Sequence, residues 1–147
     1  LWYPEAMDKS TVTAYYPYQS AGVPASFSVA ADQTAGISAS DFIAGVKTEV
    51  TPSVNAVVVP FKHMLTKIVL NVTNESGAEI SEVALGGSKL TADIDLAALT
   101  ASASETSEVA DIKACAVESG VRYGAIVVPQ TVGFVLKVTT TTGAELL

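Results

Sequence analysis

The sequence predicts an all-β protein, folded as an antiparallel β-sandwich. Short runs of β-branched and aromatic residues alternate with turn signals along most of the 147 residues. The clearest run, 89–96, alternates strictly between apolar and polar side chains, the pattern of a strand with one buried face. No long segment carries the period of a helix. Many short strands of this kind favour two packed sheets, each with one polar face.

The predicted elements follow one another at short intervals. Asp41 is placed to cap a single helical turn in 41–46, and the polar stretch 46–55, which contains Pro52, is expected to be a connection. The Ala-, Ser- and Thr-rich stretch 97–110 is expected to be a loop. Strands are predicted at 10–18, 26–31, 54–61, 64–73, 79–85, 89–96, 111–117, 122–129 and 133–141.

The alternation also predicts which side chains form the core, because successive residues of a strand point to opposite faces. Lys89 and Asp93 lie on the polar face of 89–96, and Lys137 holds the same kind of position in a later strand, so all three are expected to face solvent. The apolar positions predicted to be buried are Phe61, Ile68, Leu70, Val72, Leu90, Ile94, Ile112, Ile126, Phe134, Leu136 and Val138.

Composition and charge narrow the class of protein. Hydrophobic residues make up 49% of the chain, enough for a core, while charged residues make up 16%, against about a quarter in ordinary proteins. The net charge is −7 and Arg122 is the only arginine, so the chain lacks the basic stripe that binds nucleic acid and the basic cluster that binds an anionic membrane. Sparse charge of this kind is typical of secreted β-sandwiches.

Cys115 is the only cysteine, which excludes an intrachain disulfide and a metal site built from several cysteines. It lies in the apolar stretch ADIKACAV and is expected to be a small buried core residue. No signal peptide and no apolar run of transmembrane length are present. Because the chain begins at Leu1, it is expected to be a processed product or a fragment.

Few residues are placed for catalysis. His63 is the only histidine, and a structural role beside Phe61 and Leu65, with one local hydrogen bond, is the better interpretation of it. Asp93 and Asp95 share a strand face about 7 Å apart, which would suit Ca²⁺ or a glycosidase acid–base pair but equally suits a solvated face. We therefore expect no enzyme activity, no catalytic residue, no metal and no cofactor.

Half of the ten aromatic residues fall within the first 18 positions. Exposed aromatic faces stack on sugar rings, whereas aromatic side chains on strands more often belong to a core or an interface. This cluster keeps a carbohydrate-binding adhesin module open as the second functional interpretation. Its members are Trp2, Tyr3, Tyr15, Tyr16 and Tyr18.

Five short segments occur in a characteristic order: AYYPY at 14–18, SFSVAADQ at 26–33, DFIAG at 41–45, VVVPFKHMLTKIVLNV at 57–72 and VVPQT at 127–131. Together they resemble the fimbrillin-like family of Bacteroidetes. The fourth is similar to the family's most distinctive stretch, V-x-x-x-F-x-H-x-L-x-K-I, and the last to its I-x-P-Q-T. Each segment is short, but five in order across most of the chain form a specific pattern.

The resemblance implies a surface lipoprotein built from immunoglobulin-like, transthyretin-like β-sandwich domains that forms or decorates a type V pilus. It implies a structural or accessory subunit of a fimbrium at the outer membrane, with other pilus subunits as partners through donated β-strands. Surface glycans or proteins would be further partners in adhesion. Since Cys115 is internal, membrane attachment would come only from a lipid anchor outside this chain.

The resemblance also suggests how the chain is divided. The F-x-H stretch, here Phe61 to His63, usually begins the second domain of such proteins. With the polar stretch around Pro52, this predicts that 1–51 is the C-terminal part of a first sandwich and that 52–147 is a second sandwich lacking its last strands. One sandwich over 1–147 is the alternative. A sandwich that lacks a strand is expected to expose an apolar groove.

Overall fold

The computed structural model describes residues 9–53, 55–131, 133–143 and 145–146. This part of the chain contains thirteen strands and one short 3-10 helix, η1 (Ser38–Ser40), so the predicted all-β class is confirmed. It holds no helix long and apolar enough to cross a membrane. The strands are β1 (Ser10–Tyr16), β2 (Ser26–Ser28), β3 (Ile43–Val50), β4 (Lys62–His63), β5 (Thr66–Asn71), β6 (Ile80–Lys89), β7 (Thr91–Asp95), β8 (Thr100–Ala103), β9 (Val109–Lys113), β10 (Cys115–Glu118), β11 (Arg122–Val127), β12 (Val135–Thr140) and β13 (Glu145–Leu146).

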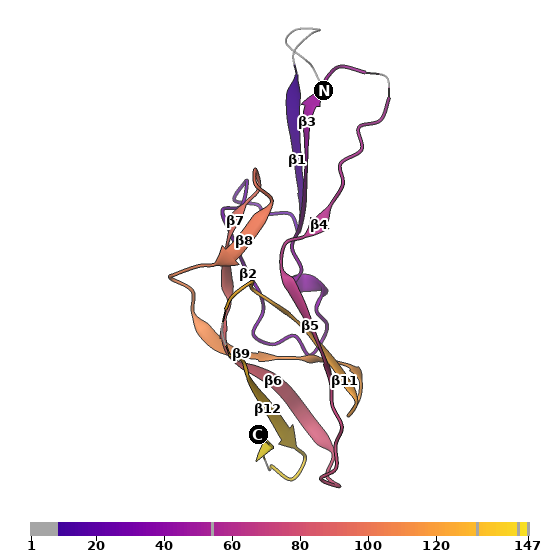
Figure 1. Cartoon of the computed structure of the whole chain (residues 1–147), viewed down its shortest axis with the longest axis vertical. Coiled ribbons are helices and arrows are strands. Elements are labelled where there is room, and N and C mark those ends of the chain that lie inside the picture. The colour runs from indigo at the N-terminus through magenta and orange to yellow at the C-terminus, as the bar shows by residue number, and fades with distance from the viewer. Residues whose placement is uncertain (1–8, 54, 132, 144, 147) are drawn as a thin grey trace.

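The strands of the described residues pair antiparallel in four small sheets, ordered β1–β3–β4, β2–β7–β8, β10–β11–β5 and β13–β12–β6–β9. The molecule is elongated: β1 and β3 rise at one end, and β6 and β12 descend toward the other (Figure 1). The last two sheets face each other as the layers of a β-sandwich, with β11 against β6 and β9. The predicted antiparallel sandwich is therefore confirmed.

The core is one hydrophobic cluster to which both layers contribute. Of the side chains predicted to be buried, Ile94, Ile112, Ile126 and Val138 are buried. Five more are partly buried against this cluster: Ile68, Leu70, Val72, Leu90 and Phe134.

Phe61 and Leu136 correct the core prediction, since their side chains are 49% and 39% exposed. Phe61 ends a stretch, 55–61, that was expected to belong to a buried strand but runs outside any strand and is mostly exposed. This stretch crosses closely over β3, where a Cβ on Gly45 would overlap the carbonyl oxygen of Pro60. The apolar run therefore lies over the outside of a sheet instead of inside the sandwich.

Two segments expected to be irregular contain strands. The predicted turn after Asp41 and the polar connection 46–55 are largely replaced by β3, which pairs with β1 from Ile43 to Val50, and Asp41 follows η1 instead of starting a helical turn. The predicted loop 97–110 contains β8, which pairs with β7. In both cases pairing with a neighbouring strand outweighs weak local preference, as is common for strands.

Gln33 joins the two layers. Its backbone lies along β9, because the Gln33 N–H donates to the Lys113 carbonyl (3.0 Å) and the Lys113 N–H donates to the Ala31 carbonyl (2.7 Å). Its side chain lies along β11: the Ile126 N–H donates to Oε1, and Nε2 donates to the Ile126 carbonyl, both at 2.8 Å. Since Gln33 is only 1% exposed, its carboxamide acts as a peptide group that completes the pairing of β11.

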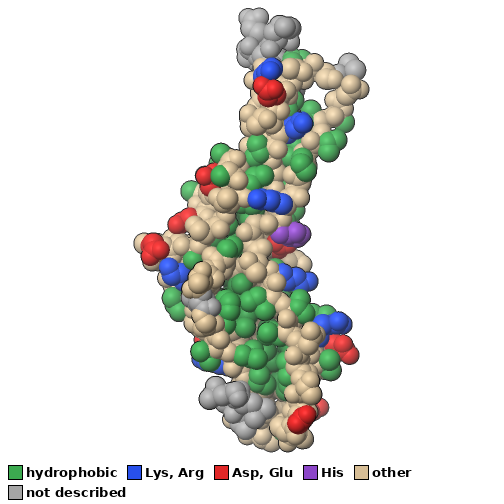
Figure 2. Space-filling model, viewed as in Figure 1, with side chains coloured by type: hydrophobic (Ala, Val, Ile, Leu, Met, Phe, Trp, Pro, Cys, Tyr) green, Lys and Arg blue, Asp and Glu red, His purple; other side chains and the backbone are tan. Residues whose placement is uncertain are grey.

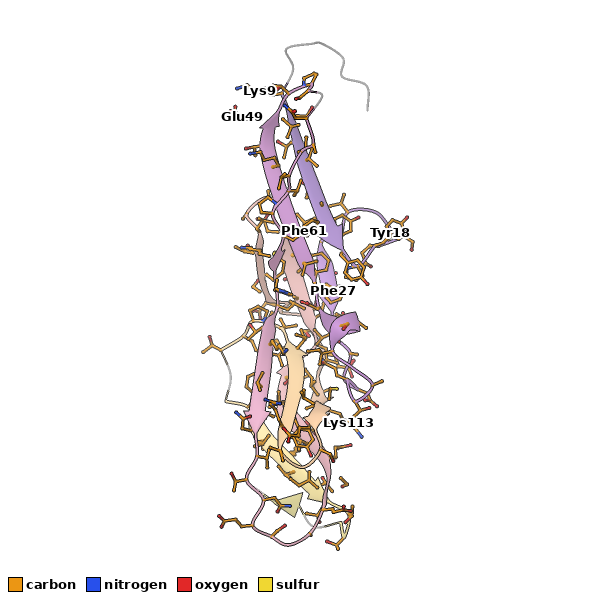
Figure 3. All side chains as sticks on the ribbon, turned by 90° about the vertical axis from the view of Figure 1, so that its right-hand side faces the viewer. Lys9, Tyr18, Phe27, Glu49, Phe61 and Lys113 are labelled. Atoms are coloured by element: carbon orange, nitrogen blue, oxygen red, sulfur yellow. The ribbon has the colours of Figure 1, made fainter. Side chains whose placement is uncertain are left out.

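Aromatic side chains connect the paired strands β1 and β3 to the sandwich. The rings of Tyr15 and Phe42 stack at 6.2 Å between centroids, and Phe27 packs against Phe42 at 5.1 Å. Figure 3 shows Phe27 within the body of the molecule and Tyr18 directed away from it. At the far end of this strand pair, Lys9 and Glu49 form an exposed ion pair at 2.9 Å.

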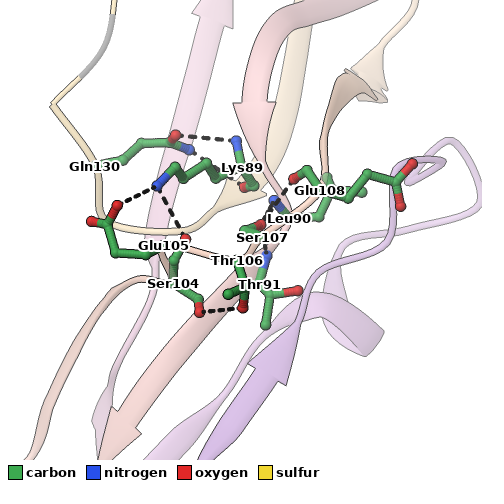
Figure 4. Close-up of polar contacts among 9 residues, drawn as sticks. All are labelled: Lys89, Leu90, Thr91, Ser104, Glu105, Thr106, Ser107, Glu108 and Gln130. Atoms are coloured by element: carbon green, nitrogen blue, oxygen red, sulfur yellow. Dashed lines mark hydrogen bonds and ion pairs between the residues drawn. The ribbon is translucent and has the colours of Figure 1, made fainter.

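Lys89 lies where β6 passes into β7 and is partly buried instead of facing solvent as predicted (Figure 4). Its Nζ donates to the Ser104 carbonyl (3.1 Å), and its backbone N–H donates to Gln130 Oε1 (3.1 Å). Beside it, Ser107 Oγ accepts the N–H groups of Leu90 (2.9 Å) and Thr91 (2.8 Å). The cationic side chain is drawn inward because this corner leaves a backbone carbonyl for it to bind.

Contacts cross the predicted domain boundary. β2 pairs with β7, the Gln33 side chain bonds Ile126, and Phe42 belongs to the main hydrophobic cluster. The division into 1–51 and 52–147 stays a prediction, as does the single sandwich over the whole chain.

We expect Gln33→Ala to lower the free energy of unfolding by about 2–4 kcal/mol, because a buried N–H and a buried C=O of Ile126 lose their partner, at about 1–3 kcal/mol each. Urea unfolding followed by circular dichroism measures this. Gln19→Ala is the control, since that side chain makes a single long bond of 3.5 Å to Pro17, and its effect should stay within about 0.5 kcal/mol. Equal effects of the two substitutions would contradict the role assigned to Gln33.

An ion pair between Lys137 and Asp111 (2.6 Å) crosses β6 and predicts a pH effect. The hydrogen bond from Lys137 holds the pKa of Asp111 below its ordinary value. The pair therefore stabilises the fold above the unfolded pKa of about 3.9, and its contribution is lost as the pH falls through the lower native pKa. Because both side chains are well exposed, we expect Asp111→Asn to lower stability by less than about 1 kcal/mol at neutral pH and to reduce the loss below about pH 4.

Chemical unfolding across this pH range checks the expectation, with Asp93→Asn as the control. Asp93 is exposed and forms no ion pair within the described residues. An acid dependence identical in wild type and Asp111→Asn would show that the Lys137 pair contributes nothing.

Candidate functional site at the edge of strand β5

β5 is the outer strand of its sheet. It pairs with β11 along its whole length, from Thr66 opposite Val127 to Asn71 opposite Arg122. In the part of the chain that the structure describes, no strand pairs with its other side. The strand therefore presents a six-residue edge with backbone N–H and C=O groups that can accept another strand.

An apolar groove lies at the end of β5, between Val72 and strand β12. Val72 follows β5, and Leu136 and Val138 face it from β12. With Ile80 and the turn 73–76, they line a groove of about 330 Å³. Figure 2 shows hydrophobic side chains gathered between β5 and β12 in the lower half of the molecule. Leu136 is more exposed than predicted because it borders this opening.

The groove carries little charge, and hydrogen bonds of Asn74 hold the turn at one of its ends. Among the described residues that line it, Glu75 alone is charged. Asn74 shapes the turn at that end: its Oδ1 accepts the N–H (3.0 Å) and hydroxyl (2.6 Å) of Ser76, and its Nδ2 donates to the Ala78 carbonyl (2.7 Å). An extended apolar segment could pair with β5 and place alternate side chains in the groove, with few charges to desolvate.

His63, the only histidine, lies away from this groove on β4. Its Nδ1 and the Asp41 Oδ2 are 2.8 Å apart, so the predicted local hydrogen bond is present. The ring does not pack beside Phe61, however, because its side chain is 72% exposed and Phe61 is exposed too. β4 is a two-residue outer strand of its sheet, and both of its side chains, Lys62 and His63, are exposed.

The two aspartates of the predicted strand face are both exposed on β7. The Oδ1 of Asp95 accepts the N–H groups of Ala97 and Ala98, each at 2.9 Å, and so closes the turn that follows. Among the described residues, no group of three side chains is placed to hold a metal ion. This arrangement supports a structural role for Asp95.

The remaining candidates are dispersed. Tyr15 is partly buried, with its hydroxyl donating to the Gly22 carbonyl (3.1 Å), whereas Tyr16 and Tyr18 are exposed. Trp2 and Tyr3 lie outside the described residues. Cys115 is partly exposed on β10, an outer strand of its sheet, which corrects the prediction of a buried core residue.

Sequence reasoning found three side chains of the groove, Val72, Leu136 and Val138, but not the groove itself. The alternation of Ile68, Leu70 and Val72 predicted one inner face, and that of Leu136 and Val138 predicted another. Which strand of a sheet lies at the edge depends on partners far along the chain, and local alternation carries no signal for it.

Comparison with known proteins decides the family. The family model described as Fimbrillin-like matches residues 1–146. The chain belongs to the fimbrillin-like family. Membership supports a pilus- or adhesion-related role at the cell surface. No curated protein sequence matches this fimbrillin-like chain.

Two solved structures share the fold of the fimbrillin-like chain. A proposed cell adhesion protein from Bacteroides ovatus has a TM-score of 0.67 and 22% identity, covering 90% of this chain and 54% of that protein. A proposed cell adhesion protein from Bacteroides uniformis has a TM-score of 0.68 and 16% identity, covering 93% of this chain and 57% of that protein. The fimbrillin-like chain thus spans little more than half the length of either.

We propose that His63 is structural in this fimbrillin-like chain. His63→Gln and Asp41→Asn should each change the free energy of unfolding by less than about 1 kcal/mol, because a pair with one partner well exposed to water contributes little. Thermal unfolding without added Zn²⁺ measures the effect of each substitution on stability. The same measurement with added Zn²⁺ tests whether His63 binds a metal ion. A rise in the unfolding temperature with Zn²⁺ that His63→Gln abolishes would instead identify a metal ligand.

Proposed function

We propose that the chain is a structural subunit or accessory protein of a bacterial surface fimbrium, joined to its neighbours by β-strand complementation. The observation that carries the proposal is the edge of β5, which no described strand covers, together with the apolar groove at the end of that strand. A donated strand would pair with β5 and fill the space between Val72 and Leu136. Family membership supports the pilus-related role, and the groove supports this particular means of assembly.

The groove can supply enough binding free energy for a persistent joint. An inserted strand would bury alternate apolar side chains, each contributing about 1.5–3 kcal/mol when removed fully from water. It would also cover Leu136 and the partly buried Leu70 on the receiving side. Backbone hydrogen bonds along Thr66–Asn71 would set the register, since a shift by one residue turns every inserted side chain to the wrong face.

The same proposal places the protein at the outer membrane, as part of a fimbrium that supports adhesion. The low proportion of charged residues suits a subunit that buries much of its edge in assembly, because each buried charge adds a desolvation cost.

Leu70→Asp tests the strand-complementation step. Leu70 lies on the inner face of β5, and an aspartate there would put a charge into the contact with the donated strand. We expect the mature full-length protein with Leu70→Asp to form at least tenfold less polymer, measured by electron microscopy and by detergent-resistant ladders on gels. Val69→Asp is the matched control: it adds the same charge to the exposed outer face of the same strand and should leave assembly intact.

Because Leu70→Asp also reaches the core, its monomer must first show the wild-type circular dichroism spectrum. Hydrogen exchange of the wild-type protein provides a measurement without substitution. In the polymer, slow exchange should appear at β5 amides that exchange quickly in the monomer. Normal polymer from folded Leu70→Asp, or unchanged β5 exchange on assembly, would overturn the proposal.

A carbohydrate-binding adhesin module is the second candidate function. The observation that favours it is the exposure of Tyr16 and Tyr18 at the end of β1, because exposed aromatic faces stack on sugars. A glycan array separates the two functions, since a purely structural subunit should bind no glycan.

A further inference from the structure

A second groove, larger than the one at the end of β5, lies where the paired strands β1 and β3 meet the sandwich. It has a volume of about 540 Å³, within the range of small-molecule sites. Its floor is apolar, and its rim carries an aromatic ring and several polar groups. The floor consists of Ile37, Ile43, Leu65 and Ile126, and the rim consists of Tyr16, Ser38, Asp41, His63 and Lys67.

The rim is an assembly of segments far apart in the sequence. Tyr16 ends β1, Ser38 begins η1, and Lys67 lies on β5 directly opposite Ile126 of β11. The β3–β4 pairing sets His63 opposite Ile43. Strand pairing therefore holds these groups in place before any ligand arrives, which lowers the ordering cost of binding.

The groove is less acidic than the molecule as a whole, because its lining holds one lysine and one carboxylate. The chain carries a net charge of −7, yet Lys67 lies on the rim and Lys62 lies next to His63 on β4. Within the described residues, neither lysine forms an ion pair. The one carboxylate on the rim, Asp41, is already engaged by His63 at 2.8 Å. Figure 2 shows basic side chains on both sides of the single histidine.

Tyr16 supplies an aromatic surface at the same rim. Its side chain is 60% exposed, although it is large and mostly apolar. An aromatic face beside an apolar floor suits the C–H face of a pyranose ring, while an unpaired ammonium group suits a carboxylate. Because Asp41 holds the Nδ1 side of His63, the Nε2 side is left to bond a sugar hydroxyl.

We propose that this groove binds one carboxylated sugar residue, with its ring against Tyr16 and its carboxylate at Lys67. The proposed sugar site gives a location to the second candidate function, carbohydrate binding, and rests on that function. It is independent of strand complementation at β5. Uronic acids and sialic acids share the required chemistry, and neutral sugars lack the carboxylate.

Titration of the whole ¹⁵N-labelled chain with D-glucuronate, N-acetylneuraminate and D-glucose tests the proposal by nuclear magnetic resonance. We expect saturable shifts of the Ser38, His63 and Ile126 amides with at least one acidic sugar, at least tenfold tighter than with glucose. The two acidic sugars identify which source the groove prefers.

Lys67→Gln should weaken binding of the acidic sugar about tenfold and leave the weak glucose binding unchanged. Tyr16→Leu should weaken both. Lys47→Gln is the control: it removes the same charge four residues beyond Ile43 on β3, away from the rim, and should change affinity less than about twofold. All three side chains are exposed or at the surface, and wild-type spectra of the free variants confirm folding.

Three results would overturn the proposal: no saturable shift with either acidic sugar, equal affinity for glucuronate and glucose, or equal losses from Lys47→Gln and Lys67→Gln. If the glycan array detects binding but these groove amides do not shift, adhesion resides elsewhere on the molecule. If the sugar site is absent, the proposal of strand complementation at β5 is unaffected, because polymer formation tests it separately.

Discussion

The carboxamide of Gln33 is the interaction on which the rest of the architecture depends. β10 pairs with β11 only as far as Cys115 opposite Gly124, so beyond that point β11 needs another partner on that side. Gln33 fills this place with its side chain while its backbone follows β9 of the facing sheet. One residue thus connects both layers with hydrogen bonds that water cannot reach, and a connection of this kind tolerates little displacement.

The position of η1 and of the paired strands β1 and β3 follows from the contacts of Gln33. The Ala30 carbonyl accepts a hydrogen bond from Gln33, and the Ala30 N–H donates to the buried hydroxyl of Ser40 in η1 (3.0 Å). η1 leads directly into Asp41 and then Phe42, which stacks on Tyr15 of β1. The paired strands β1 and β3 and the Asp41–His63 pair are therefore positioned relative to β11 through a continuous series of contacts.

Alternation along the sequence was sufficient to predict the fold class and most inner faces. It failed where a residue's environment depends on a distant segment. Phe61 is apolar and follows a run of valines, but its segment lies across the outside of β3. Lys89 holds a polar position in its strand, but a carbonyl of the 104–108 turn draws it inward. Gln33 lies in the SFSVAADQ segment, and nothing in that segment states that its partner is Ile126, 93 positions away.

The two candidate sites lie toward opposite ends of β5, because Lys67 near its start lines one groove and Val72, just after its last residue, lines the other. Side chains of neighbouring residues on β5 point to opposite faces. Lys67 is therefore directed to the rim of the groove that Tyr16 borders, while Ile68 and Leu70 face the interior. A strand added to the edge of β5 would occupy the inner face and the backbone edge and would leave the outer face of Lys67 open. Assembly through a strand donated to β5 would also order β5 further, because backbone pairing on both sides of a strand restricts it more than pairing on one side. The rim that carries Tyr16 and Lys67 would then be displayed on a stiffer support, at one copy per subunit along the fibre, where many weak sugar contacts act together.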